Sequence, residues 1–63
     1  MSLNDSVIKD IQAWELYQQQ QKRILDDAIK YGDYGSKVSA EEMIRYSQKR
    51  IDELEIKLAR KGA

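Results

Sequence analysis

Two pairs of identical adjacent acidic residues, Asp26-Asp27 and Glu41-Glu42, are the side chains best suited to acid–base or metal chemistry. Neighbouring residues on a helix point about 100° apart, so neither pair can supply a set of metal ligands by itself. The chain has no cysteine and no histidine. This composition excludes disulfides, Cys/His zinc sites, cysteine nucleophiles and imidazole acid–base catalysis. We therefore expect no catalytic residue, no metal and no cofactor, and a protein that is not an enzyme.

Length and charge restrict the kinds of partner. The chain has 63 residues, and its eleven basic residues balance its eleven acidic ones. A net charge of zero provides no long-range field to attract nucleic acid or a membrane. No apolar run is long enough to span a bilayer and the start lacks a secretory pattern, so we expect a cytoplasmic location, in a host cell or a virion if the chain comes from a phage. A domain of this size buries only about 60% of its unfolded surface and commonly needs a partner chain for stability. We expect protein partners, as a homo-oligomer or within a larger assembly, and no small-molecule substrate.

The positions of glycine and proline indicate two helices. There is no proline, and the three glycines are Gly32, Gly35 and Gly62. Gly32 can end a helix in the left-handed conformation, and a short link favours antiparallel neighbours. The predicted fold is all-α, a single antiparallel two-helix hairpin of the coiled-coil type. Its parts are a helix over about 4–31, a turn over 32–38 and a helix over about 40–61.

The second helix has a predicted start and a predicted apolar stripe. Ser39 and Glu42 are spaced as a capping box, in which each side chain bonds the backbone of the other residue. This pattern is the reason for placing the helix start near residue 40. The stripe, with spacings of three and four, consists of Ile44, Ser47, Ile51, Leu54 and Leu58.

The first helix carries a longer seam that is apolar at both ends and polar in the middle. Glutamine is a good helix former, so ordinary helix is the favoured interpretation of the polar part, although a buried glutamine there could set the register or the oligomeric state. The seam consists of Val7, Ile11, Trp14, Gln18, Gln21, Leu25 and Ala28, and its flanks carry Ile8, Tyr17, Ile24 and Tyr31.

Two helices cannot enclose a core, because each apolar stripe is covered on one side only. Counting outward from the turn places Trp14 beside the Leu54–Leu58 end of the second helix, with the first helix overhanging by about one turn. Trp14 could be a binding hot spot, or it could close the open end of the hairpin. The residues that we expect to contact a partner protein are Ile8, Ile11, Trp14, Tyr17, Ile24, Leu25, Ile51, Leu54 and Leu58.

Two other groups of side chains have a structural and a functional interpretation. The tyrosines Tyr31, Tyr34 and Tyr46 are expected to pack over the turn rather than to stack on bases. A modest set of basic residues along the second helix could touch RNA, although a solvated face is the favoured interpretation. This set consists of Lys37, Arg45, Lys49 and Arg50.

The segment from Tyr34 to Ile44, continuing into Ile51-Asp52-Glu53-Leu54-Glu55, resembles the small head-completion and head–tail adaptor proteins of tailed bacteriophages (the gpW-like group). In that group a glycine- and tyrosine-containing turn leads to a Ser- or Thr-capped helix with an Ile-x-x-Leu-Glu type stripe. The resemblance covers about half of the chain and implies a structural virion protein that works in a ring and catalyses nothing.

The segment from Ser39 to Gln48 also resembles the second helix of the small sporulation phosphatases that dephosphorylate response regulators. Those proteins are helical hairpins with a Ser-Gln-x-Leu-Asp motif. Here Ser47-Gln48 is followed by Lys49-Arg50-Ile51-Asp52, which has one residue more than the motif and turns Asp52 by about 100° around the helix.

The leading interpretation is a non-enzymatic structural or protein-interaction module, and specifically a phage-like virion component. The alternatives are a small regulatory protein that binds a response regulator, as the phosphatases do, and a helical hairpin dimer that binds RNA.

Overall fold

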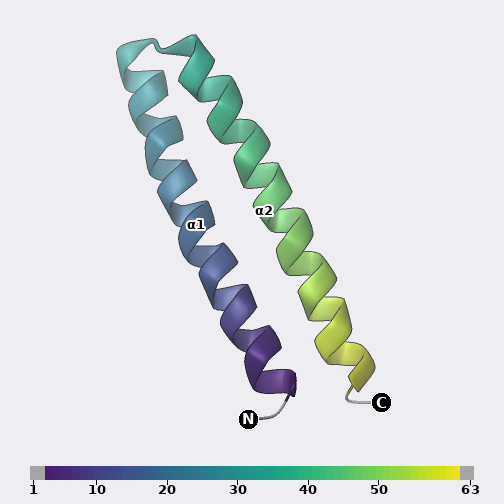
Figure 1. The fold of residues 1–63 in the computed structure, drawn as a ribbon. Helices are drawn as coiled ribbons and strands as arrows, with labels where there is room; N and C mark the ends of the chain where they lie inside the picture. The colour runs from purple at the N-terminus through teal and green to yellow at the C-terminus, as the bar shows by residue number, and fades with distance from the viewer. Residues whose placement is uncertain (1–2, 62–63) are drawn as a thin grey trace.

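The structure, a computed structural model that describes residues 3–61, is a hairpin of two antiparallel helices (Figure 1). Helix α1 runs from Leu3 to Tyr31 over 29 residues, and helix α2 runs from Tyr34 to Lys61 over 28 residues. The two helices lie side by side along a body of 47 × 17 × 11 Å, with the turn at one end and both termini at the other. The predicted all-α antiparallel hairpin is confirmed.

The turn that joins the helices consists of Gly32 and Asp33 alone. Gly32 has a φ of 71°, in the left-handed region that glycine adopts without steric cost. The Gly32 amide donates to the Ile29 carbonyl at 3.4 Å, and the Asp33 amide donates to the Ala28 carbonyl at 2.8 Å. These are the two bonds of a Schellman motif, which satisfies the last carbonyls of α1. Gly32 therefore ends α1 as predicted.

Asp33 is the N-terminal cap of α2. Its carboxylate accepts the Ser36 amide at 3.2 Å and the Ser36 hydroxyl at 2.7 Å, and its carbonyl accepts the Lys37 amide at 3.0 Å. The predicted turn over 32–38 and the Ser39–Glu42 capping box were wrong, because Ser39 lies inside α2, whose first residue is Tyr34. The physical reason is that Asp33 satisfies the first helical amides earlier, and no proline stops the following residues from joining the helix.

The shorter turn changes which residues of the two helices meet. Trp14 lies against Tyr46, with 5.6 Å between ring centroids, instead of beside Leu54–Leu58. The predicted overhang of α1 was also wrong, because α2 gains one and a half turns at its start and the two helices have nearly equal lengths. Tyr46 is consequently three turns away from the bend, and only Tyr31 and Tyr34 flank it.

The core is a narrow seam of side chains between the helices. All seven residues of the predicted first-helix seam and all five of the second-helix stripe are at least partly buried. Among residues 5–60, however, the buried apolar side chains are only Ala28, Ala40 and Ile51, joined by the buried Ser47. The Ser47 hydroxyl donates to the Ile44 carbonyl at 2.8 Å, so its burial leaves no unpaired donor. Small residues at the seam let the helices approach closely but bury little apolar area.

Alanine at the two glycines of the turn region should change stability in opposite directions. Gly32→Ala has space for its Cβ but must adopt a left-handed φ, which should cost about 1 kcal/mol. Gly35→Ala lies in helical backbone with only an ordinary 3.9 Å contact to Asp33 Oδ1, and should gain about 0.5 kcal/mol. Urea unfolding followed by circular dichroism measures both, and equal shifts in the same direction would contradict this arrangement of the turn.

Removing the Asp33 carboxylate should destabilise the hairpin, because Ser36 loses the acceptor for its amide and its hydroxyl. The Ser36 side chain and then its backbone lower the pKa of the Asp33 carboxyl. The stabilisation is therefore complete above the unfolded aspartate pKa of about 4 and is lost as pH falls through the lower folded pKa. Asp33→Ala should lower the urea midpoint at pH 7, whereas Asp33→Asn should keep most of the cap but remove this contribution to acid sensitivity. Urea titrations at pH 7 and pH 3 compare them, with Asp26→Asn as the control.

Candidate protein-binding surface

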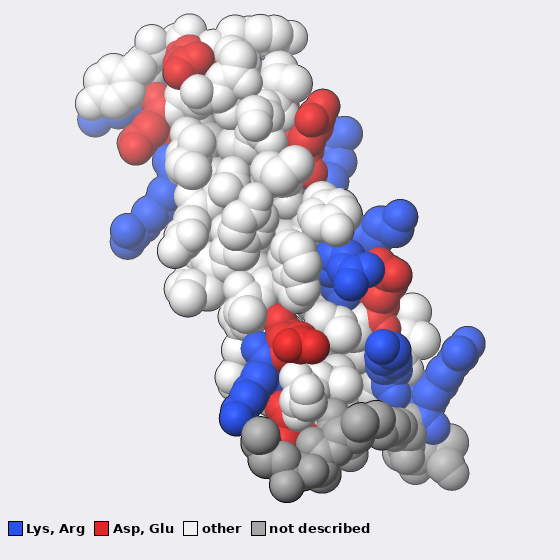
Figure 2. Space-filling view, viewed as in Figure 1, with Lys and Arg blue, Asp and Glu red and all other residues white. Residues whose placement is uncertain are grey.

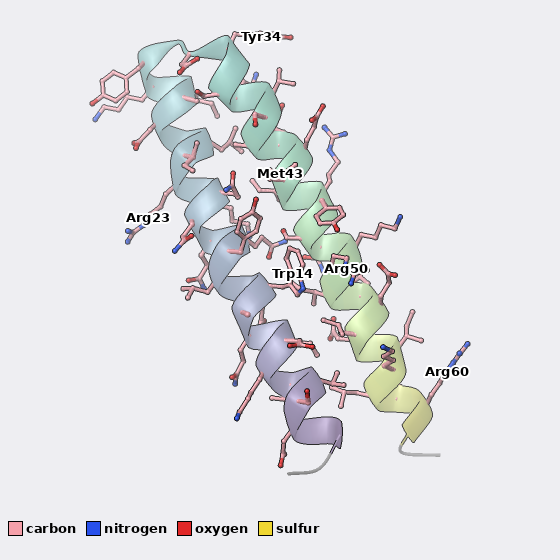
Figure 3. All side chains as sticks on the ribbon, viewed as in Figure 1. Trp14, Arg23, Tyr34, Met43, Arg50 and Arg60 are labelled. Atoms are coloured by element: carbon pink, nitrogen blue, oxygen red, sulfur yellow. The ribbon has the colours of Figure 1, made fainter. Side chains whose placement is uncertain are left out.

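A shallow apolar groove crosses both helices on one face of the hairpin. It is lined by Ala13, Trp14 and Tyr17 from α1 and by Met43 and Tyr46 from α2, and its volume is about 420 Å³. Figure 3 shows Trp14 in the space between the two helices, on the side toward the viewer. Because both helices line the groove, it exists only when the hairpin is closed.

Trp14 organises the groove through two edge-to-face aromatic contacts. Its ring lies 5.8 Å from Tyr17 with an interplanar angle of 88°, and 5.6 Å from Tyr46 with an angle of 72°. Such arrangements set the positive edge of one ring against the negative face of another and contribute about 0.5–1.5 kcal/mol beyond the area that they bury. The contact with Tyr46 joins the two helices, so Trp14 both supports the fold and lines the groove.

The surface around the groove is uncharged over a long stretch. Ile24 follows Tyr17 by seven residues, or two helical turns, and therefore lies on the same face, where 44% of it is exposed. Figure 2 shows uncharged surface along the middle of this face, with Lys, Arg, Asp and Glu along its edges and toward the termini. We call this surface the aromatic face and define it as Ala13, Trp14, Tyr17, Ile24, Met43 and Tyr46.

Arg50 borders the aromatic face on α2, one turn beyond Tyr46, and Figure 3 shows it close to Trp14. Its Nη1 lies 3.6 Å from the Glu53 carboxylate, and 43% of its side chain is exposed. An exposed ion pair of this length contributes little to stability. Arginine at the rim of an aromatic surface is, however, typical of protein interfaces.

The opposite face of the hairpin is closed by polar contacts. Gln18 Nε2 donates to Gln48 Oε1 at 3.0 Å and to the Ile44 carbonyl at 3.5 Å. Gln48 Nε2 in turn donates to Asp52 Oδ1 at 2.9 Å. Since Gln48 follows Tyr46 by two residues, it points about 200° away from the aromatic face. Through Gln18, the polar middle of the α1 seam thus contacts α2.

The residues predicted for a partner interface divide into three groups. Trp14, Tyr17 and Ile24 lie on the aromatic face. Ile8 is 42% exposed, but it is nine residues from Tyr17 and so lies on the opposite side of α1. The others belong to the seam between α1 and α2, where Ile51 is buried and four more are partly buried, namely Ile11, Leu25, Leu54 and Leu58.

Three residues of the groove, Ala13, Met43 and Tyr46, were not among the residues predicted from the sequence to bind a partner. Met43 and Tyr46 each precede a stripe position by one residue, Ile44 and Ser47 respectively. A residue that precedes a stripe position by one lies at the edge of the stripe. On the closed hairpin it shares a face with the residues at the neighbouring edge of the α1 seam. This spacing was the available signal, but it gains meaning only when the pairing of the two helices is known.

The residues of the phosphatase-like motif do not converge. The Ser47 hydroxyl is fully buried and is occupied by its bond to the Ile44 carbonyl. Gln48 and Asp52 are exposed and bonded to each other. Of the three motif residues, only Gln48 and Asp52 are exposed, on the face opposite to the aromatic one, while Ser47 is not accessible.

The basic residues of α2 do not form one patch. Lys37 lies over the Tyr34 ring, with 6.0 Å between its Nζ and the ring centroid. Arg50 is thirteen residues farther along α2 and points about 220° away from Lys37. Within residues 3–61, no group of three acidic side chains could hold a metal ion, and neither helix has the stretch of apolar sequence that a bilayer crossing requires.

Comparison of the chain with protein-family models, with curated proteins and with solved structures finds no significant match. The geometry of the two helices is therefore the basis for a functional proposal.

Truncating Trp14 should destabilise the fold far more than truncating an exposed apolar residue. Trp14→Ala removes both ring contacts and opens the seam, which should cost about 2 kcal/mol, less than for a fully buried tryptophan. Leu16→Ala is the matched control, because Leu16 is 59% exposed and should change stability by less than about 0.5 kcal/mol. Thermal unfolding by circular dichroism compares the two variants, and similar losses for both would contradict the assigned role of Trp14.

Proposed function

We propose that this chain is a non-enzymatic protein-interaction module that binds protein through the aromatic face. The observation that carries the proposal is the uncharged groove of Trp14, two tyrosines and a methionine, which both helices build and no other part of the described hairpin covers. Protein interfaces are enriched in these residue types and in arginine, and their centres are depleted in charge.

The small core supports this proposal on energetic grounds. A folded chain of 7.4 kDa is expected to expose about 4,200 Å², whereas this hairpin exposes 4978 Å². The difference of roughly 800 Å² equals what one partner contributes to a protein interface of ordinary size. A protein docked on the aromatic face would supply the burial that two helices cannot provide for each other.

The biological setting of this binding is part of the proposal. The resemblance of residues 34–44 to phage head–tail adaptors favours a structural role within a particle, where neighbouring subunits would cover the face. A regulatory protein of the response-regulator type would instead present Gln48 and Asp52, which lie on the opposite side. The proposal places the partner on the aromatic face. An experiment that shows which face of the hairpin contacts a partner therefore separates the structural role from the regulatory one.

Photocrosslinking from single positions tests the proposal in cells that naturally express the chain. A photoreactive phenylalanine analogue replaces Tyr46 in one variant and Tyr34 in the other. Both tyrosines are exposed, 49% and 74% respectively, but only Tyr46 lies on the aromatic face. We expect protein adducts from position 46 at several times the yield from position 34, with the adduct identified by mass spectrometry.

Absence of any protein adduct from position 46, or an equal yield from position 34, would overturn the proposed function. A third variant with the photoreactive group in place of Gln48 reports on the opposite face. Adducts from Gln48 alone would favour the regulatory alternative.

A further inference from the structure

We propose that the occupant of the aromatic face is an amphipathic helix of another protein, which sets a carboxylate against Arg50 and completes a three-helix bundle. This inference rests on the proposed function, because it names the kind of segment that fills the same surface. The backbone of the groove walls selects a helix, and the charges along the border of the groove select a helix that carries a carboxylate.

The walls of the groove favour a helix over an extended segment. All five lining residues belong to α1 or α2, where the backbone amides and carbonyls bond one another within each helix. An extended segment would lay its own amides and carbonyls on an apolar surface that offers them no partner, and unpaired backbone groups are costly to bury. A helix bonds its backbone internally and inserts only an apolar row of side chains, which is how helices occupy grooves.

A second copy of the hairpin has no free helical stripe to place in the groove. The apolar stripes of α1 and α2 already face each other in the seam, where all of their residues are at least partly buried. The aromatic face of a second copy is itself a groove between two helices. A groove does not present the single projecting row of side chains that another groove accepts. The occupant is therefore a helix of a different protein, whose own stripe is free.

Arg50 marks the place where that helix carries a negative charge. It follows Tyr46 by four residues, about 6 Å farther along α2, and borders the groove close to Trp14 (Figure 3). Its Nε is buried and has no hydrogen-bond partner within the described residues, and its Nη1 lies 3.6 Å from the Glu53 carboxylate. A carboxylate that meets a guanidinium with two parallel bonds forms one of the strongest pairs in proteins. Because 43% of the side chain is exposed, Arg50 can turn toward a docked helix to make that pair.

Two further charges fit a helix that lies along the groove. Lys57 follows Arg50 by seven residues, so it is exposed about 10 Å farther along the same side of α2. Asp10 precedes Tyr17 by seven residues and is exposed on the α1 border of the face. A docked helix would meet these two cations over α2 and the aspartate over α1. Charges that flank an apolar stripe in this way set partner choice in coiled coils.

Glu53 competes with the partner for Arg50. It follows Tyr46 by seven residues and therefore shares this side of α2. Its ion pair with Arg50 is 3.6 Å long, and 51% of the Glu53 side chain is exposed, so the pair is weak. A partner carboxylate with better geometry displaces it. Removal of the Glu53 carboxylate should therefore strengthen binding.

The segment crosslinked to the photoreactive group at position 46 identifies the occupant directly. Proteolysis of the adduct and mass spectrometry locate the bound segment in the sequence of the partner. We expect apolar residues spaced three and four apart, with Asp or Glu within two turns and no proline among them. A segment with a central proline, a segment without a carboxylate, or an adduct of twice the 7.4 kDa chain mass would overturn this inference.

Substitutions that remove one charge at a time test the role of Arg50 in the same crosslinking experiment. Arg50→Gln should lower the adduct yield from position 46 several-fold, whereas Glu53→Gln should raise it. Lys49→Gln is the matched control, because Lys49 is exposed and points about 100° away from Arg50. Glutamine is a good helix former, and circular dichroism checks that the variants keep equal helicity. Equal yields from the Arg50→Gln and Lys49→Gln variants would contradict the pairing with Arg50.

Synthetic helices test the chemistry of the face without the natural partner. Two peptides of about 20 residues share one leucine stripe and contain no tryptophan. One carries glutamate and the other lysine at the positions that would face Arg50 and Lys57. Trp14 is the only tryptophan of the chain, so its emission reports docking. The glutamate peptide should bind about fivefold more tightly at low salt, and high salt should reduce the difference. Equal dissociation constants, or unchanged Trp14 emission up to about 1 mM of either peptide, would be evidence against an acidic helix.

The same adducts separate failure of this inference from failure of the proposed function. An adduct from position 46 whose bound segment is not an acidic helix overturns this inference but leaves the protein-binding surface. Absence of any adduct from position 46 overturns both.

Discussion

The two-residue turn fixes how the helices of this hairpin face each other. Gly32 ends α1 by entering the left-handed region, and the next residue, Asp33, both completes that ending and caps α2. Because only two residues separate the helices, each residue of α1 lies beside a fixed position on α2. That alignment sets Trp14 against Tyr46, Gln18 against Gln48, and the groove at the middle of the rod. A longer turn would move the tyrosine away from the tryptophan and divide the aromatic face.

The seam between the helices explains why a face remains open. Close approach of helices is favoured by small residues, and three of the four buried side chains among residues 5–60 are small, namely Ala28, Ala40 and Ser47. Such residues bury little apolar area, so the larger side chains sit on the flank of the seam, partly covered and partly exposed. The flank on one side is closed by glutamine hydrogen bonds and the flank on the other is aromatic. The hairpin is therefore two-sided, and the difference between its sides is the reason for assigning the binding surface to one of them.

Prediction from the sequence was most successful where a pattern repeats along one helix. The seam on α1 and the stripe on α2 were identified residue by residue, because a spacing of three and four returns to the same side of a helix whatever its partner. The predicted end of α1 was also correct. Glycine lacks a Cβ and so adopts the left-handed backbone conformation that ends a helix, whatever surrounds it. The start of α2 was wrong because Ser39 and Asp33 both offer good caps. The pattern around Ser39 was complete in the sequence, whereas the Asp33 cap depended on its place directly after a Schellman turn.

The sequence by itself determined that this chain is a helical hairpin whose two apolar stripes cannot enclose a core, because helix periodicity and glycine position are local properties. Among the nine predicted interface residues it also placed Trp14, Tyr17 and Ile24 where the aromatic face lies, though without separating them from the seam. Only the tertiary structure decided which tyrosine and methionine complete the groove, and on which side. The reason is that a groove between two helices depends on their register. Register results from the length of the turn and from contacts such as Trp14–Tyr46, which no spacing along one helix contains.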